Sequence, residues 1–205
     1  MKMVRTFCAV AIGVIGLARP ASADWLLTGY VAPLFSVQTS SSTSVNLPAE
    51  RFDNSVGLGL NIASAFPGAG NLGFELDWGW YQKGLQTSNV LGTRYASRLM
   101  SLTTNFFYSP GIARVRPYFS LGPSFEYRVD DALAQFTTPS GWAAGFNGGA
   151  GVIGFATQRL GVRVDARYFR NFGDFYDLRA EATQRRSGWN NLTFIRTFLG
   201  VTVVL

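Results

Sequence analysis

The chain has 205 residues, with 18 Lys and Arg against 12 Asp and Glu, one cysteine and no histidine. The missing histidine removes the usual general base at neutral pH, which excludes hydrolases and acyltransferases that depend on a Ser–His pair. Because Cys8 is the only cysteine, the composition also disfavours zinc or copper sites, and we expect no metal, no cofactor and no enzymatic activity. The net charge is +6 and falls to +3 without Lys2, Arg5 and Arg19 of the N-terminus, which is too mild and too scattered to indicate a nucleic-acid partner.

The N-terminus predicts a cleaved signal peptide. It has a basic start, an apolar run over 7–17 and the small residues Ala21 and Ala23 before the expected cut. The apolar run is shorter than the roughly 20 residues that a membrane-spanning helix needs. We therefore divide the chain into a signal peptide, 1–23, and one domain, 24–205.

Eight strands are predicted in the domain. They are expected at 25–37, 55–66, 72–83, 97–108, 116–128, 142–155, 161–170 and 192–205. Each is long enough for the roughly 9–11 residues of a tilted membrane crossing. The connections alternate long and short along the chain, so all the long ones are expected at one end of the strands. Short periplasmic turns and long external loops are typical of an outer-membrane barrel.

The stretch 72–80, L-G-F-E-L-D-W-G-W, predicts one apolar and one charged face for its strand. Every second residue is large and apolar, and the residues between them are small or acidic, a period that belongs to a β-strand. One face therefore suits lipid, while the other carries Glu75 and Asp77. In a transmembrane barrel the apolar face meets lipid and the charged face lines the lumen.

Aromatic residues are expected to gather at the two ends of such strands, although strands favour aromatic residues in any case. At the end with the long loops the sequence places Phe35, Phe52, Trp78, Trp80, Tyr81, Tyr127, Trp142, Tyr168, Phe172 and Trp189. At the other end it places Trp25, Phe66, Phe106, Tyr108, Phe119 and Phe155. The alternation of loop lengths supports the interpretation of these two groups as membrane girdles.

The inward faces predict a balanced charge network in the lumen. Its expected members are four acids and four arginines: Glu75, Asp77, Glu126, Arg128, Arg163, Asp165, Arg167 and Arg196. Unpaired charges in a narrow lumen would be costly, which favours this network over a catalytic pair made by Glu75 and Asp77. The inward glycines either make room for the large side chains or leave a narrow water-filled passage, and we favour packing.

Three pieces carry a resemblance to a known family. N-F-F-Y at 105–108, R-P-Y-F-S-L-G at 116–122 and 161–169 are similar to the small eight-stranded outer-membrane barrels, namely the OmpA-like, OmpX-like and alphaproteobacterial "porin family" proteins. The resemblance implies insertion by the outer-membrane assembly machinery, which recognises the last strand. Here that strand, 198–205, departs from the family pattern by ending in Leu205, where the family has an aromatic residue.

The sequence thus predicts an all-β fold, an eight-stranded antiparallel up-and-down transmembrane β-barrel in the bacterial outer membrane. We expect a structural or surface-interaction role, in envelope integrity or adhesion, with outer-membrane lipid, lipopolysaccharide and an external partner of the loops as contacts. A narrow porin for small solutes is one alternative. A soluble periplasmic carrier of lipocalin type is another, and it would require Asp77 and Arg163 on the outside of the barrel.

Overall fold

The computed structural model describes residues 25–40, 54–65, 71–88, 94–110, 114–130, 141–172, 174–176 and 186–205. The predicted signal peptide, 1–23, lies outside these ranges. No helix within them is long and apolar enough to cross a membrane.

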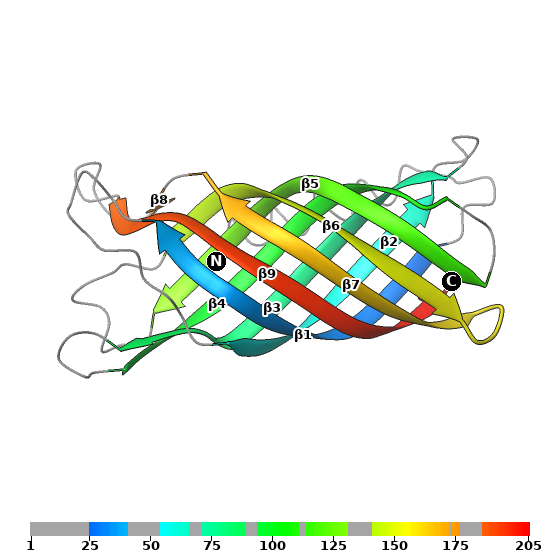
Figure 1. Ribbon diagram of the computed structural model, residues 1–205, viewed down its shortest axis with the longest axis horizontal. Helices are drawn as coiled ribbons and strands as arrows, with labels where there is room; N and C mark the ends of the chain where they lie inside the picture. The colour runs from blue at the N-terminus through cyan, green and yellow to red at the C-terminus, as the bar shows by residue number, and fades with distance from the viewer. Residues whose placement is uncertain are drawn as a thin grey trace, which may run out of the picture.

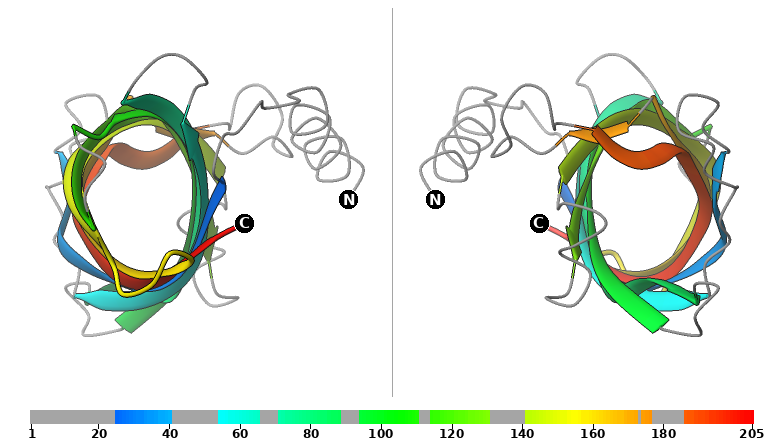
Figure 2. Two further views of the ribbon diagram at one scale, coloured as in Figure 1. Left: turned by 90° about the vertical axis from the view of Figure 1, so that its right-hand side faces the viewer. Right: turned by 90° about the vertical axis from the view of Figure 1, so that its left-hand side faces the viewer.

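Eight long strands in chain order build the fold. They are β1 (Trp25–Ser40), β2 (Ser55–Ala65), β3 (Leu72–Ser88), β4 (Arg94–Tyr108), β5 (Val115–Asp130), β6 (Gly141–Phe155), β7 (Leu160–Asn171) and β9 (Arg186–Val204). Each pairs antiparallel with the next long strand, and β1 pairs with β9, which closes the ring (Figure 1, Figure 2). The predicted eight-stranded antiparallel barrel is therefore confirmed. We call the end where β1 begins the turn end and the end where β2 begins the loop end.

The strands are staggered around the barrel. A path through paired residues that leaves β1 at Trp25 returns to β1 at Phe35, ten residues nearer to the loop end. The path passes Ser64, Phe74, Phe106, Leu121, Gly148, Tyr168 and Ile195. Closure with such a stagger requires strands that tilt against the barrel axis, as Figure 1 shows.

The loop end differs from the prediction at two places. The expected long loop at 87–95 is shortened at both ends, because β3 and β4 continue to pair beyond an irregularity between Tyr81 and Leu85 and leave only 89–93 as their connection. Within the expected loop 171–190, a short strand, β8 (Asp174–Tyr176), pairs with β9 and β6 where β7 has ended. Strict alternation of long and short connections is therefore wrong at the third connection.

The distribution of side chains is the inverse of that in a water-soluble protein. Along β7 every residue alternates between exposed and buried. Leu58 on β2 and Leu121 on β5 are each 62% exposed, whereas Arg163 is 1% exposed. Asp77 and Arg163 lie inside the barrel, which is the opposite of the placement that the alternative of a soluble lipocalin-type carrier requires.

The inward glycines make room for large side chains. A methyl group at Gly151 would lie 2.5 Å from Cζ of Tyr118, and one at Gly149 would lie 2.6 Å from Cγ of Arg167. At Gly59 a methyl group would collide with the ring of Tyr30. These glycines therefore serve the packing of the lumen, the interpretation that the sequence favoured.

The aromatic girdles hold with two corrections. At the loop end Trp78, Trp80, Trp142, Tyr168 and Phe172 are exposed on the outer face, and at the turn end Phe106, Tyr108 and Phe119 are. Tyr81, however, is fully buried, because it shares the inward side of β3 with Glu75. Phe155 also turns inward, where it packs on a buried apolar cluster. Phe52 and Phe66 lie outside the described residues, as does the side chain of Trp189.

Candidate functional site

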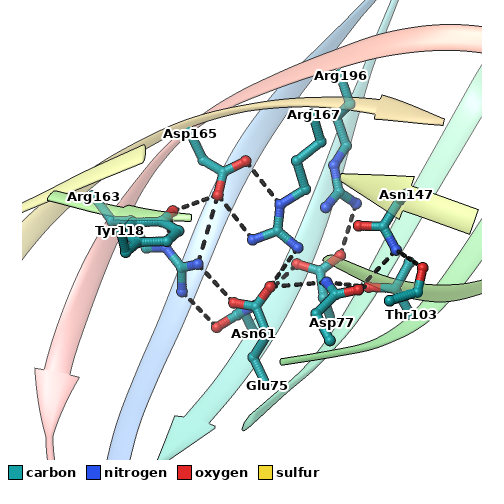
Figure 3. A network of polar contacts seen from close by, with 12 residues as sticks. Asn61, Glu75, Asp77, Thr103, Tyr118, Asn147, Arg163, Asp165, Arg167 and Arg196 are labelled. Carbon is teal, nitrogen blue, oxygen red and sulfur yellow. Dashed lines mark hydrogen bonds and ion pairs between the residues drawn. The ribbon is translucent and has the colours of Figure 1, made fainter. Parts of the chain in front are cut away.

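Six of the eight predicted charged residues meet in the middle of the lumen (Figure 3). We call this group the arginine–carboxylate network; its members are Glu75, Asp77, Arg163, Asp165, Arg167 and Arg196. Each of these residues is at most 1% exposed. Three carboxylates thus balance the charge of three guanidinium groups that are all shielded from solvent.

Glu75 is held between two arginines of the opposite wall. Its Oε2 lies 2.7 Å from Nη2 of Arg163, and its Oε1 lies 2.6 Å from Nη1 of Arg167. The amide nitrogens of Asn105 and Asn61 donate to the same two oxygens at 2.8 and 3.1 Å. Because β3 and β7 lie on different sides of the ring, these contacts cross the lumen.

Asp165 and Arg167 make a two-pronged pair along β7. Nε and Nη2 of Arg167 donate to Oδ1 and Oδ2 of Asp165, both at 2.8 Å. Two parallel charge-assisted hydrogen bonds fix orientation as well as distance. The Tyr118 hydroxyl donates to Asp165 and accepts a 2.6 Å hydrogen bond from Nε of Arg163, which ties β5 into the network.

Asp77 pairs with Arg196 on β9 at 2.7 Å. The Tyr30 hydroxyl donates to Asp77 at 3.1 Å. The guanidinium of Arg196 also lies 4.9 Å from the ring centroid of Phe169, a distance at which a cation is attracted to an aromatic face. Asn61 donates to Asp77 at 3.2 Å as well as to Glu75, so it joins this pair to the rest of the network.

Apolar side chains enclose the network at both ends. The turn-end cluster consists of Leu26, Ala63, Tyr118 and Ile153 with Phe107, Phe155 and Val204 packed against it. The loop-end cluster consists of Tyr30, Ala32, Leu34, Val37, Tyr81, Leu99, Ala143, Phe169, Leu192, Phe194 and Phe198. In such surroundings ion pairs are screened little, and losing one partner of a buried pair is strongly destabilising.

Glu126 and Arg128 depart from the predicted arrangement. Both are buried, but they lie further toward the loop end of β5, beyond the level of Tyr118. No ion pair joins Glu126 to the network among the residues that the structure describes, and neither of its carboxylate oxygens has a hydrogen-bond partner there. Which height in the lumen each inward residue reaches depends on the stagger of the strands, which the alternation of faces alone does not reveal.

Several neutral members of the site were not predicted from the sequence. Asn61 and Asn105 contact Glu75, and Asn147 donates to Asn105 at 2.8 Å. All three occupy inward positions of their strands, so a polar residue at an inward position is the signal that could have found them. Asn61 and Asn105 add donors to the Glu75 oxygens that the arginines also contact, and Asn61 donates to the Asp77 oxygen that Arg196 does not contact.

The site consists of buried ion pairs and hydrogen bonds that cross the lumen. Glu75 and Asp77 are both engaged by arginines and amides, which favours the ion network over the alternative of a catalytic carboxylate pair. Within the described ranges no three Asp, Glu, His or Cys side chains stand together as metal ligands.

A closed eight-stranded barrel with an apolar outside and a charged, filled lumen has the fold of the small outer-membrane β-barrels. Comparison with solved structures supports this class. No protein-family model and no curated protein matches the chain.

Three of the similar structures illustrate the match. Neisserial surface protein A (NspA) is 15% identical, with a TM-score of 0.56 over 90% of this chain and 99% of its own. OprG from Pseudomonas aeruginosa is 13% identical, with a TM-score of 0.58 over 90% of this chain and 96% of its own. Ail, the attachment invasion locus protein of Yersinia pestis, was solved with the heparin analogue sucrose octasulfate; it is 14% identical, with a TM-score of 0.52 over 89% of this chain and 98% of its own. Identities this low show a shared fold alone.

Proposed function

We propose that the protein resides in the bacterial outer membrane as a closed barrel with a structural or surface-interaction role, and that it is not an enzyme. The observation that carries this proposal is the inverted distribution of side chains. Leu58, Leu121 and Leu199 are each at least 60% exposed, while three arginines and three carboxylates are buried as a network. An outer face of this kind suits hydrocarbon, and it would be a large unprotected apolar patch in water.

The lumen supports a role in the envelope more than a role in transport. The network crosses the lumen, and apolar clusters cover it at both ends. An eight-stranded barrel is only wide enough for its own side chains to fill. A narrow porin is the competing function, and it requires these ion pairs to part during conduction.

The partners follow from the same placement. Outer-membrane lipid and lipopolysaccharide would cover the apolar face, and the assembly machinery would recognise the last strand, where Leu199 and Val201 face outward. An external partner would meet the loops. The similar fold of Ail, named for attachment and solved with a heparin analogue, supports adhesion as one form of that contact.

Fractionation of cells that express the protein tests this proposal. The protein should be recovered with the outer membrane, and it should migrate differently on a denaturing gel before and after boiling, because a closed barrel has no unpaired strand edge. Recovery in the soluble periplasmic fraction, or a single migration position in both lanes, would contradict the proposal.

A further inference from the structure

One arginine of the outer face lies at the edge of the apolar band. Arg170 is the last outward residue of β7, and its side chain is exposed. The outward residues before it on this strand are all apolar or aromatic: Leu160, Val162, Val164, Ala166 and Tyr168. In the proposed orientation the long loops face the outside, so this edge of the band belongs to the outer leaflet. Arg170 therefore lies where hydrocarbon gives way to the headgroup layer of that leaflet.

Aromatic side chains flank Arg170 on the outer face. Arg170 is paired with Phe146 of β6, and the exposed Phe172 is the next outward residue after it. The rings of Phe146 and Phe172 pack with their centroids 5.5 Å apart and their planes at 32°. The backbone nitrogen of Phe172 donates to the carbonyl of Ala144 at 2.7 Å, which holds the end of β7 against β6. The guanidinium thus projects from aromatic surroundings of the kind found at the lipid–water interface.

The charge of Arg170 has no carboxylate partner within the part of the chain that the structure describes. Every Asp and Glu side chain described there is buried in the lumen, on the other face of the wall; they are Glu75, Asp77, Glu126 and Asp165. An anion for Arg170 therefore has to come from the membrane. A phosphate suits this position, because the planar guanidinium offers it two parallel charge-assisted hydrogen bonds.

The outer face on the membrane side of Arg170 suits acyl chains. Ala166 lies four residues, about 13 Å, from Arg170 along β7 and is paired with Ala150 of β6. Phe119 is paired with Ala150 from the other side and is 60% exposed. The outer surface is therefore low at the two alanines and high at Phe119, which gives a hydrocarbon chain a side wall as well as a floor. A cation next to the headgroup layer and an apolar surface below it match the two parts of a phosphorylated lipid.

We infer that Arg170, with Phe146, Phe172 and Tyr168 around it, forms a binding site for a phosphate and the adjoining acyl chains of lipid A, the lipid part of lipopolysaccharide. The inference rests on the proposed function, which puts the loop end in the outer leaflet, and it assigns to this lipid one site on the wall. Lipid A fits because it carries phosphate next to its acyl chains in that leaflet. Arg98 is the other outward arginine described toward the loop end, and it lies on β4, three strands from β7.

Lipid binding to the purified barrel tests the inference. Lipid A with its phosphates, lipid A from which the phosphates have been removed, and phosphatidylglycerol are each titrated into the protein in a mild detergent. Native mass spectrometry measures the bound fraction. Arg170→Gln removes the proposed phosphate contact, and Arg98→Gln, which removes the same charge from the same end of the barrel, is the matched control. Both side chains are exposed, and heat-dependent gel migration checks that each variant is folded.

The unmodified barrel should bind phosphorylated lipid A about 10-fold more tightly than the dephosphorylated form, and Arg170→Gln should abolish this preference. Arg98→Gln should change the preference by no more than about twofold. If Arg170→Gln keeps the preference, or if both variants lose it equally, the inference is wrong. If binding of phosphatidylglycerol depends on Arg170 in the same way, the site takes any anionic lipid and the assignment to lipid A is wrong. In each of these cases recovery of the protein with the outer membrane leaves the proposed function standing.

Discussion

The outer face and the lumen of this barrel place opposite demands on the same strands. On β7 the outward residues include Val164, which is 53% exposed, and the inward ones include Arg163, Asp165 and Arg167, each 1% exposed. An outward side chain needs only to be apolar, and its neighbours matter little. An inward one needs specific partners, because a charge in the lumen without its counterion is expensive.

The contrast between the outer face and the lumen indicates which positions of such a barrel tolerate substitution. Substitutions between apolar residues on the outer face keep its fit to hydrocarbon. In the lumen each charge depends on two or three others, as Glu75 depends on Arg163, Arg167 and Asn105. Matched substitutions on a single strand can therefore separate the two faces experimentally.

The largest effect is expected for Arg167→Ala. The change leaves Asp165 without its two-pronged partner and Glu75 with one arginine in place of two, and we expect a loss of about 3–5 kcal/mol in the free energy of unfolding. Urea unfolding in lipid vesicles, followed by tryptophan fluorescence, measures it. Arg170→Ala, on the exposed side of β7, is the control and should change the free energy by about 0.5 kcal/mol or less. Equal effects of the two variants would contradict the comparison.

A charge on the outer face should cost somewhat less and should depend on depth. Leu121→Arg, near the middle of β5, is expected to destabilise the barrel in vesicles by about 2–4 kcal/mol. Leu72→Arg, at the turn end of β3, should cost about 0–1 kcal/mol, because an arginine there reaches the interface. If both variants unfold like the unmodified protein, the outer face does not meet hydrocarbon.

A single methyl group distinguishes the two faces of β6. Gly151→Ala would push the new methyl group against Tyr118 and against the backbone oxygen of Val164, which lies 2.6 Å away, and should destabilise by about 1–3 kcal/mol. Gly154→Ala should be nearly neutral, because no atom lies within 4 Å of the added group. The midpoint of urea unfolding decides between them, and a neutral Gly151→Ala would mean that the lumen is loosely filled.

The smallest effect is expected for Glu126→Gln. Its comparison with Glu75→Gln distinguishes a buried glutamate outside the network from one inside it. Glu126 has no ion pair among the described residues, so the amide should change the free energy of unfolding by about 1 kcal/mol or less. Glu75→Gln removes the charge that two arginines contact and should cost several times more. If the Glu126 variant were as destabilised as the Glu75 variant, Glu126 would have to belong to the network.

The sequence predicted which residues face inward or outward better than it predicted the level of each residue along the barrel axis. Alternation over 72–80 was enough to place Glu75 and Asp77 inside and Trp78 outside, because a strand has a period of two. Tyr81 follows from the same rule, and its assignment to the girdle ignored that rule. The separation of Glu126 from the network depends on the stagger, which arises only when the ring closes.

The extensions at the loop end were beyond prediction for a different reason. Pairing of β3 with β4 up to Ser88 and the short strand β8 depend on backbone hydrogen bonds between neighbouring segments. The sequence of these segments does not alternate strictly between apolar and polar residues, so it gives no period-two signal. The partners of each arginine were likewise unpredictable, because they depend on contacts across the lumen between β3 and the pair β7 and β9.

Conductance of the unmodified protein in a planar lipid bilayer tests the closed lumen most directly. The network joins β3 to β7 and β9 by ion pairs of 2.6–2.7 Å, and apolar clusters cover it on both sides. We expect inserted barrels to pass no steady ionic current, and Arg167→Ala to produce a leak in barrels that remain folded. A large, steady current through the unmodified barrel would contradict the closed lumen and establish the narrow porin in its place.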